Sequence, residues 1–328
     1  MRTSRGTSGD TAPRLRPHSR TGAGTGSRTR PRTRAATLAA VAATAALTAG
    51  SGLGAAPALA AGASGNTAGT GQDDTTRRYV ALGDSYASGA GVPQQTDTVC
   101  ARSDRNYPTL VNAALTPAAH KDVTCGGATT KDMTRAQNPT SPPQFDALNA
   151  ETDLVTLTIG GNDIGFGGII LRCVTLGALD PRGAPCKTSY TWTGTDKLAA
   201  TVDATAPKIA ATLDGVRARA PHARILVTGY PAILPDDGSN CPSVVSIAKG
   251  DAPYLRDVHK RLNGMIAAQA AARGATYVDT YTKSVGHDVC KARGTRWMEP
   301  LNSSEAAAFH PNAAGERAMA DAVLGAHG

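Results

Sequence analysis

The residues best suited to chemistry are a serine just after one apolar segment and a histidine far downstream. Ser85 ends the tripeptide Gly83-Asp84-Ser85, directly after the apolar run at residues 79–82, and His310 lies within Phe309-His310-Pro311. A serine hydroxyl is a weak nucleophile at neutral pH. It needs a base within hydrogen-bond distance and donors for the charge that develops on the attacked oxygen. Because histidine is the commonest such base, this pair of residues indicates acyl transfer.

Apolar runs rich in β-branched residues alternate with helical patterns, which is typical of a parallel sheet covered by helices. The pattern predicts strands at residues 79–82, 122–125, 154–159, 225–228 and 276–278, helices at 107–115, 196–220, 254–273 and 312–324, and long connections at 164–194 and 231–253. Ligands of such sheets bind beyond the carboxyl ends of the strands. Ser85, Gly126-Gly127 and residues 160–163 each follow a predicted strand, so we expect them to share one site.

Four sequence blocks occur in order along the chain: Gly83-Asp84-Ser85, residues 126–130, Gly160-Gly161-Asn162-Asp163 and His310-Pro311. Together they resemble the blocks of the SGNH (GDSL) hydrolase superfamily, and residues 77–328 are similar to secreted actinobacterial lipases and esterases. The resemblance implies an α/β, three-layer flavodoxin-like fold with a central, mostly parallel five-stranded sheet. It also implies Ser85 as nucleophile, His310 as general base, and an oxyanion hole formed by the Ser85 and Gly127 N–H groups and the Asn162 amide.

Each of these residues has a structural alternative, because serine favours helix N-caps and glycine and asparagine favour turns. We interpret Asp84 and Asp163 as residues that orient turns, since a carboxylate beside a developing oxyanion opposes the reaction. Of the other histidines, His287 beside Asp288 is the one rival base, but it matches no motif.

The sequence departs from the family pattern next to the histidine. Many members carry aspartate three residues before it, whereas this chain has Ala307 there. We therefore predict that a backbone carbonyl within residues 306–308 accepts the ring N–H of His310. Within this stretch we expect the carbonyl of Ala307. Glu305 is the alternative orienting group.

The positive charge of the chain is confined to its beginning. The formal net charge is +8, yet residues 1–60 hold nine arginines and one acid, and the remainder has 25 basic and 25 acidic residues. A nucleic-acid partner is therefore not predicted. The arginine-rich stretch, the apolar segment from Ala35 and the small-x-small pattern Ala58-Leu59-Ala60 are typical of an export signal at 1–60. A membrane anchor is the weaker alternative, and residues 61–76 are interpreted as a flexible linker.

Six cysteines lie in the expected mature part, residues 77–328, which is long enough for one domain with a substantial core. Export permits disulfides, and neighbours in sequence suggest the pairs Cys100–Cys125, Cys173–Cys186 and Cys241–Cys290. A metal cluster is the alternative, but the chain has no C-x-x-C motif and no histidines paired at ligand spacing.

The function predicted from these observations is that of a secreted, monomeric ester hydrolase that needs no cofactor or metal and does not stay inserted in a membrane. Ile164, Phe166 and residues 169–171 could line an acyl channel or belong to the core, and phospholipase, acyltransferase and sugar deacetylase activities stay open. A chymotrypsin-like protease is disfavoured because there the histidine precedes the serine. An α/β-hydrolase requires G-x-S-x-G, and position 87 is Ala. A secreted surface-binding protein without turnover is the non-enzyme alternative.

Overall fold

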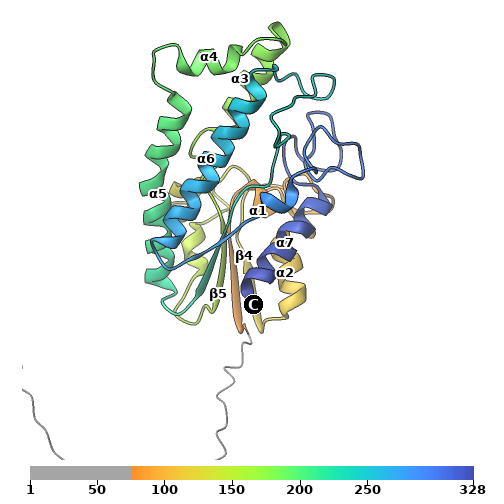
Figure 1. Ribbon diagram of the computed structural model, residues 1–328. Coiled ribbons are helices and arrows are strands. Elements are labelled where there is room, and N and C mark those ends of the chain that lie inside the picture. Colours follow the sequence, from red (N-terminus) through yellow and green to blue (C-terminus); the bar gives the residue numbers. More distant parts are fainter. Residues whose placement is uncertain (1–75) are drawn as a thin grey trace, which may run out of the picture. The chain divides into compact units, whose positions relative to one another are not determined.

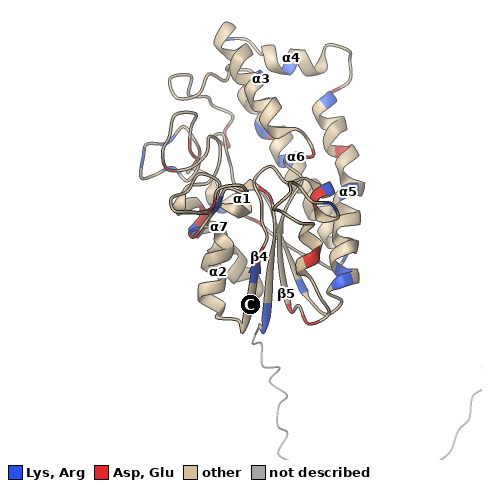
Figure 2. Cartoon of the chain, turned by 180° about the vertical axis from the view of Figure 1, so that it is seen from behind, with Lys and Arg blue, Asp and Glu red and all other residues tan. Residues whose placement is uncertain are grey.

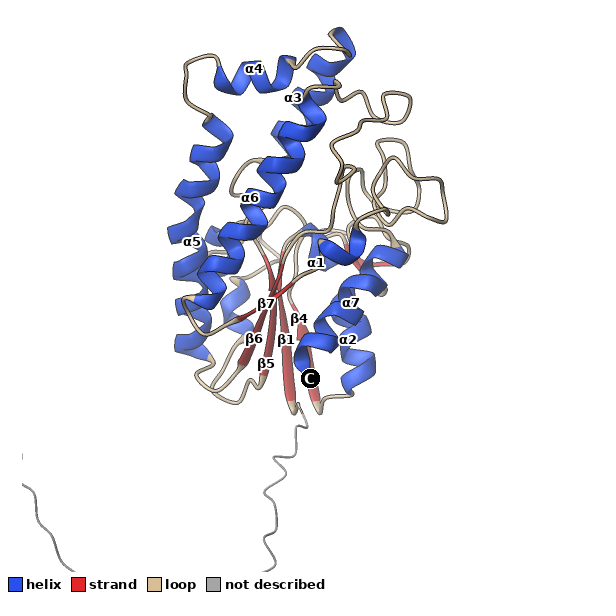
Figure 3. Ribbon diagram, in the orientation of Figure 1, coloured by secondary structure: helices blue, strands red, loops and turns tan. Residues whose placement is uncertain are grey.

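A central sheet of five parallel strands organises the protein (Figure 3). This computed structural model describes residues 76–328; the predicted export signal at 1–60 lies outside them, as does the predicted linker at 61–76 apart from Thr76. The strands pair in the order β4-β1-β5-β6-β7. Their bounds are β1 (Arg78–Gly83), β4 (Ala119–Asp122), β5 (Leu154–Thr158), β6 (Arg224–Thr228) and β7 (Thr276–Val278). If the five strands of this sheet are numbered by their order along the chain, their spatial order is 2-1-3-4-5, which is the flavodoxin-like arrangement.

Helices cover both faces of the sheet, with α2 and α7 on one side and α5 and α6 on the other (Figure 1). The helices are α1 (Ser85–Ser88), α2 (Tyr107–Leu115), α3 (Phe166–Leu179), α4 (Pro185–Thr191), α5 (Lys197–Arg219), α6 (Asp251–Ala271) and α7 (Ala313–His327). Single 3-10 turns occur at Thr130–Met133, Gln144–Ala147 and Thr282–Ser284, and β2 (Gln95–Asp97) pairs with β3 (Arg102–Ser103) as an antiparallel ribbon.

The two cores follow from the alternation of side chains along β1. Val80 and Leu82 are fully buried with residues of α5 and α6, whereas Tyr79 and Ala81 are fully buried with residues of α2 and α7. Successive side chains of a strand point to opposite faces, so one apolar strand serves both layers. The predicted three-layer α/β fold is confirmed, and all four strand pairings are parallel.

Two parts of the sequence-based assignment are wrong. The second strand of the sheet, β4, lies at Ala119–Asp122 rather than at 122–125, because this edge strand is polar and gives no apolar signal. The stretch 164–194, predicted as a long connection, contains α3 and α4. Glycines 167, 168 and 177 weakened the helical signal of α3, but Ile169 and Cys173 bury one side of this helix.

The three predicted disulfide pairings are confirmed. Cys100 bonds to Cys125, Cys173 to Cys186, and Cys241 to Cys290. The second pair joins α3 to α4, so it fixes the region that lies above the carboxyl ends of the strands (Figure 1).

One carboxyl group is buried between α2 and α7. Glu316 of α7 has no solvent exposure, and one of its oxygens accepts the backbone N–H of Tyr107 at 2.7 Å. The other oxygen has no hydrogen-bond partner among the described residues. Burial raises the pKa of Glu316 well above its ordinary value of 4.5, so the neutral acid is favoured in the folded protein.

Basic and acidic residues are interspersed along the described part of the chain, and α5 carries lysine, arginine and aspartate (Figure 2). Within residues 76–328, none of the helices has the length and apolar character needed to cross a bilayer.

Candidate active site

The turn after β1 presents Ser85 at the carboxyl end of the sheet. Gly83 adopts a φ of +147°, and a Cβ at this position would lie 2.7 Å from the carbonyl oxygen of Thr158, so glycine is required there. Asp84 then caps α1, since its carboxylate accepts the N–H of Tyr86 at 3.0 Å. The N-cap role considered for Ser85 thus belongs to Asp84, and the Ser85 hydroxyl is free for another contact.

The serine and the distant histidine meet. Nε2 of His310 lies 2.7 Å from Oγ of Ser85, and Nδ1 of the same ring lies 2.7 Å from the backbone carbonyl oxygen of Ala308. A carbonyl oxygen only accepts, so Nδ1 carries the proton and Nε2 of the neutral ring is an acceptor. In this tautomer His310 is oriented to take the proton of the Ser85 hydroxyl.

The prediction that the Ala307 carbonyl orients His310 is wrong. The orienting carbonyl belongs to Ala308 rather than to Ala307, although it lies within the predicted stretch 306–308. The Ala307 carbonyl accepts the backbone N–H of His310 at 3.1 Å, and its N–H donates to Ala90 at 2.8 Å. Both polar groups of Ala307 therefore hold the loop instead of facing the imidazole.

The alternative orienter and the rival base lie in other contacts. Glu305 pairs with Arg293, with Oε1 2.7 Å from the guanidinium. His287 stacks on Trp297 with the ring centroids 3.8 Å apart. Within the described part of the chain, neither residue contacts Ser85 or His310.

Three hydrogen-bond donors line the cleft beside Ser85 and His310. No hydrogen bond within residues 76–328 uses the backbone N–H of Ser85 or of Gly127. The Asn162 amide donates one hydrogen to the carbonyl oxygen of Ala128 at 2.9 Å, which leaves its second hydrogen available. Ser85, Gly127, Asn162 and His310 line one cleft of about 480 Å³. The arrangement can stabilise negative charge on an oxygen bound next to Ser85.

The acidic residues of the two motifs have the structural contacts expected of them. Asp163 accepts the N–H and the hydroxyl of Thr130 at 2.9 and 2.6 Å, and so links the turn after β5 to the segment after Gly127. Burial raises the pKa of Asp84 to about 7, while hydrogen bonds from Tyr230 and Tyr86 lower it. Burial lowers the pKa of His310 below its ordinary value of 6.5, and the hydrogen bond to Ala308 opposes that change.

The chain is similar to known proteins over most of its length. Residues 81–318, which are more than half of the chain, match the GDSL-like Lipase/Acylhydrolase family. The chain belongs to this family. Such membership confirms the predicted superfamily and the class of carboxylic ester hydrolases to which the chain belongs.

Relatives of this GDSL hydrolase include named enzymes of the genus Streptomyces. It is 47% identical to Lipase 2 of Streptomyces coelicolor, over 77% of this chain and 86% of that protein. It is similar to the crystal structure of phospholipase A1 from Streptomyces albidoflavus, with a TM-score of 0.64 and 30% identity over 76% of this chain and 99% of that one. The extracellular lipase of Streptomyces rimosus gives a TM-score of 0.63 and 28% identity, with the same shares covered.

Two cavities meet at the serine of this GDSL hydrolase. The open cleft continues between α3 and the loop before His310, where Leu171 and Leu301 flank it. A second, smaller cavity of about 60 Å³ begins at Ser85 and Asn162 and extends between α3 and α6. Its walls are mainly apolar and include the predicted channel residues Ile164, Phe166, Ile169 and Ile170. Ser85 thus lies where a small apolar cavity joins a wider cleft.

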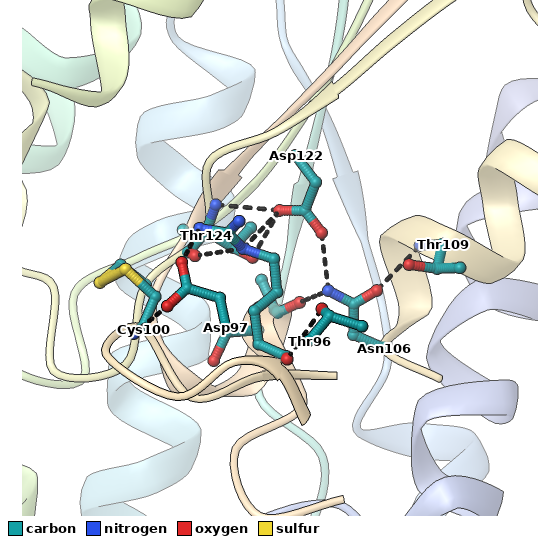
Figure 4. Close-up of polar contacts among 12 residues, drawn as sticks. Thr96, Asp97, Cys100, Asn106, Thr109, Asp122 and Thr124 are labelled. Atoms are coloured by element: carbon teal, nitrogen blue, oxygen red, sulfur yellow. Dashed lines mark hydrogen bonds and ion pairs between the residues drawn. A yellow bond between two sulfur atoms is a disulfide. The ribbon is translucent and has the colours of Figure 1, made fainter. Parts of the chain in front are cut away.

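In this GDSL hydrolase, a network of polar contacts supports the turn at Gly126-Gly127 (Figure 4). The carboxylate of Asp122, at the end of β4, accepts the N–H of Thr124 at 2.9 Å and the side-chain amide of Asn106 at 2.7 Å. Arg102 donates to the carbonyl oxygen of Thr124 at 2.9 Å. The carbonyl of Cys100, in the same β2–β3 ribbon, accepts the N–H of Gly126 at 2.7 Å. The ribbon and its disulfide therefore fix the residues that precede Gly127.

Sequence reasoning missed two tyrosines at this site. Tyr86 donates its hydroxyl to the carbonyl of Phe309 at 2.5 Å, and its ring centroid lies 4.8 Å from that of His310. Tyr230 follows β6 and contacts both Asp84 and Gly161. Their place after strand ends is the only signal in the sequence, because tyrosine is also a common core residue. Among the described residues no cluster of three or more His, Cys, Asp or Glu side chains is arranged to hold a metal ion.

Proposed function

We propose that this protein hydrolyses carboxylic esters with lipid-like acyl groups through an acyl-enzyme on Ser85. The observation that carries the proposal is the chain of contacts from the Ser85 hydroxyl to His310 at 2.7 Å and from His310 to the Ala308 carbonyl at 2.7 Å. This is the nucleophile, base and orienting group of a serine hydrolase, with a peptide carbonyl in the place of the usual carboxylate.

In the first half-reaction, Oγ of Ser85 bonds to the ester carbonyl carbon while its proton passes to Nε2 of His310. The negative charge on the former carbonyl oxygen is stabilised by the N–H groups of Ser85 and Gly127 and by the Asn162 amide. Collapse of this intermediate breaks the bond to the alcohol, which leaves with the proton from His310. Water then attacks the acyl-enzyme with the same histidine as base, and the acid is released.

The two cavities support the choice of acyl group. The small apolar cavity offers a binding site to a hydrocarbon chain attached at Ser85, because transfer of apolar surface out of water is favourable by about 25 cal/mol per Å². The open cleft has room for the alcohol part. A glycerol ester of a fatty acid meets both requirements.

Phospholipid hydrolysis is the second candidate function. It is supported by the 30% identity to the solved phospholipase A1, whose length is covered to 99%. The alcohol part of a phospholipid carries a phosphate headgroup, and the open cleft would have to accept it. Parallel assays on a triglyceride and a phospholipid with the same acyl chains discriminate the two candidates.

The test is turnover of a series of p-nitrophenyl esters by the mature protein and its variants. We expect Ser85→Ala and His310→Ala each to lower kcat at least about a thousandfold. His287→Ala is the matched control, since it removes an imidazole that contacts neither residue, and it should retain wild-type activity. Full activity of Ser85→Ala would refute the proposed function.

We also propose that the protein is secreted and acts as a monomer. The three disulfides support an oxidising compartment. Mass spectrometry of the protein in culture medium should find an N-terminus at Ala61, and light scattering should give the mass of one chain. Retention of residues 1–60 in a membrane fraction would contradict this proposal.

A further inference from the structure

The hydroxyl of Tyr230 connects two loops of the active site. It lies 2.6 Å from a carboxylate oxygen of Asp84, the residue before Ser85, and 2.8 Å from the backbone nitrogen of Gly161, the residue before Asn162. The ring of Tyr230 lines the small apolar cavity and packs edge-on against Tyr86, with the two ring centroids 4.9 Å apart. A single phenol therefore contacts the neighbours of two predicted catalytic groups.

The chemistry of the phenol fixes the direction of both hydrogen bonds. Burial and the nearby Asp84 raise the pKa of Tyr230 well above its ordinary value of 10, so the hydroxyl keeps its proton. It therefore donates to Asp84 and accepts the N–H of Gly161. Asp84 accepts the Tyr86 N–H with its other oxygen, at 3.0 Å, so both oxygens of the carboxylate are engaged.

The main chain of Tyr230 is held firmly by α6. The side chain of Asn263 accepts the Tyr230 N–H and donates to the Tyr230 carbonyl, both at 2.9 Å. Nε2 of His259 lies 3.1 Å from the same carbonyl. The ring also limits the approach of the opposite loop, because a Cβ at Gly161 would lie 3.1 Å from the hydroxyl. Tyr230 thus links the loops to a long helix rather than moving with them.

We infer that Tyr230 is a positioning residue, whose hydroxyl fixes the loop of Gly161 and Asn162 relative to the turn that carries Ser85. This inference rests on the proposed function, since it gives Asn162 and Ser85 their catalytic roles. A displacement of about 1 Å between such groups is enough to cost a large factor in rate. Both hydrogen bonds of the hydroxyl are made to the protein, so it acts through Asn162 rather than on the substrate.

The first experiment compares Tyr230→Phe with Tyr254→Phe in ester hydrolysis. Tyr254 of α6 also donates its hydroxyl, here partly buried, to a carboxylate, that of Asp196 at 2.9 Å, but lines neither cavity. We expect Tyr230→Phe to lower kcat about 10- to 100-fold with KM changed less than about twofold, and Tyr254→Phe to keep the wild-type kcat. Equal losses in the two variants would overturn the inference, because loss of any such hydroxyl would then suffice.

The second experiment is a double-mutant cycle with Asn162→Ala. If Tyr230 acts by placing Asn162, removal of its hydroxyl should lower kcat less than about threefold once the Asn162 amide is absent. The same 10- to 100-fold loss in both backgrounds would show that Tyr230 does not act through Asn162. Should Tyr230→Phe fail to fold, Asp84→Asn replaces it in the cycle, since it alters the other end of the same hydrogen bond. A full multiplicative loss there would also overturn the inference.

Failure of the inference is distinguishable from failure of the proposed function. Ser85→Ala is measured in the same assay, and its activity decides the proposed function alone. An inactive Ser85→Ala together with a fully active Tyr230→Phe would reject the role of Tyr230 and leave the serine mechanism intact.

Discussion

The buried carboxyl group of Glu316 should make the stability of the protein fall with rising pH. Burial raises the pKa of Glu316 in the folded state, whereas the unfolded chain titrates near the ordinary value of 4.5. The stability of the fold is therefore fully present below about pH 4.5 and is lost as the pH rises towards the folded-state pKa. While the pH lies between these two pKa values, each unit of pH costs up to about 1.4 kcal/mol of unfolding free energy.

Glu316→Gln removes this dependence, because the amide has a similar shape and does not ionise. Its oxygen can still accept the N–H of Tyr107. Relative to wild type, the free energy of unfolding of the variant should rise between pH 5 and 7, by up to about 1.4 kcal/mol per pH unit. Other titrating groups, including Asp84, are present in both proteins and cancel in the difference.

Guanidinium unfolding followed by tryptophan fluorescence at pH 5, 6 and 7 measures this difference. Glu151→Gln is the control, because the Glu151 side chain is 80% exposed and should give the same difference at each pH. If Glu316→Gln and wild type keep a constant difference across this range, Glu316 is not neutral in the folded protein and the reasoning fails.

Three further predictions concern catalysis and the disulfides. Protonation of His310 should abolish turnover, and because burial lowers the pKa of His310, kcat should fall only below pH 6.5. The variant Asp84→Asn should show the same fall of kcat in acid. If the fall disappears in this variant, it is caused by Asp84 instead. Glu305→Gln should keep kcat within about twofold, because Glu305 pairs with Arg293, and a loss as severe as that of His310→Ala would contradict the role of Ala308. Replacement of Cys100 and Cys125 by serine should lower the free energy of unfolding by about 3 kcal/mol, which denaturation midpoints measure. It should also lower kcat for ester hydrolysis, because this disulfide holds the turn before Gly127.

The sequence predicted those parts of the site in which side-chain identity carries the chemistry. Ser85 and His310 are 225 residues apart in sequence, yet each stands in a short motif at the edge of an apolar segment. The strands β5 and β6 were found to within one residue, because apolar, β-branched runs distinguish buried parallel strands.

Other parts of the structure depend on contacts that leave little trace in the sequence. A backbone carbonyl has the same chemistry at every residue, so nothing distinguished Ala308 from Ala307 until the loop geometry was known. The strand β4 pairs through its main chain at the edge of the sheet, and its residues Ala-His-Lys-Asp show no apolar run. Tyr230 acts through its hydroxyl alone, and an aromatic residue after a strand predicts only burial.

The Ala308 carbonyl that faces His310 has a consequence for the conditions the enzyme tolerates. A peptide carbonyl does not ionise, so its hydrogen bond to the imidazole does not weaken at a pH at which an aspartate would be protonated. The ring should therefore keep its orientation in acid. In return, the imidazolium formed during each turnover is stabilised less than it would be beside an anion, so proton transfer from the serine relies more heavily on the oxyanion donors.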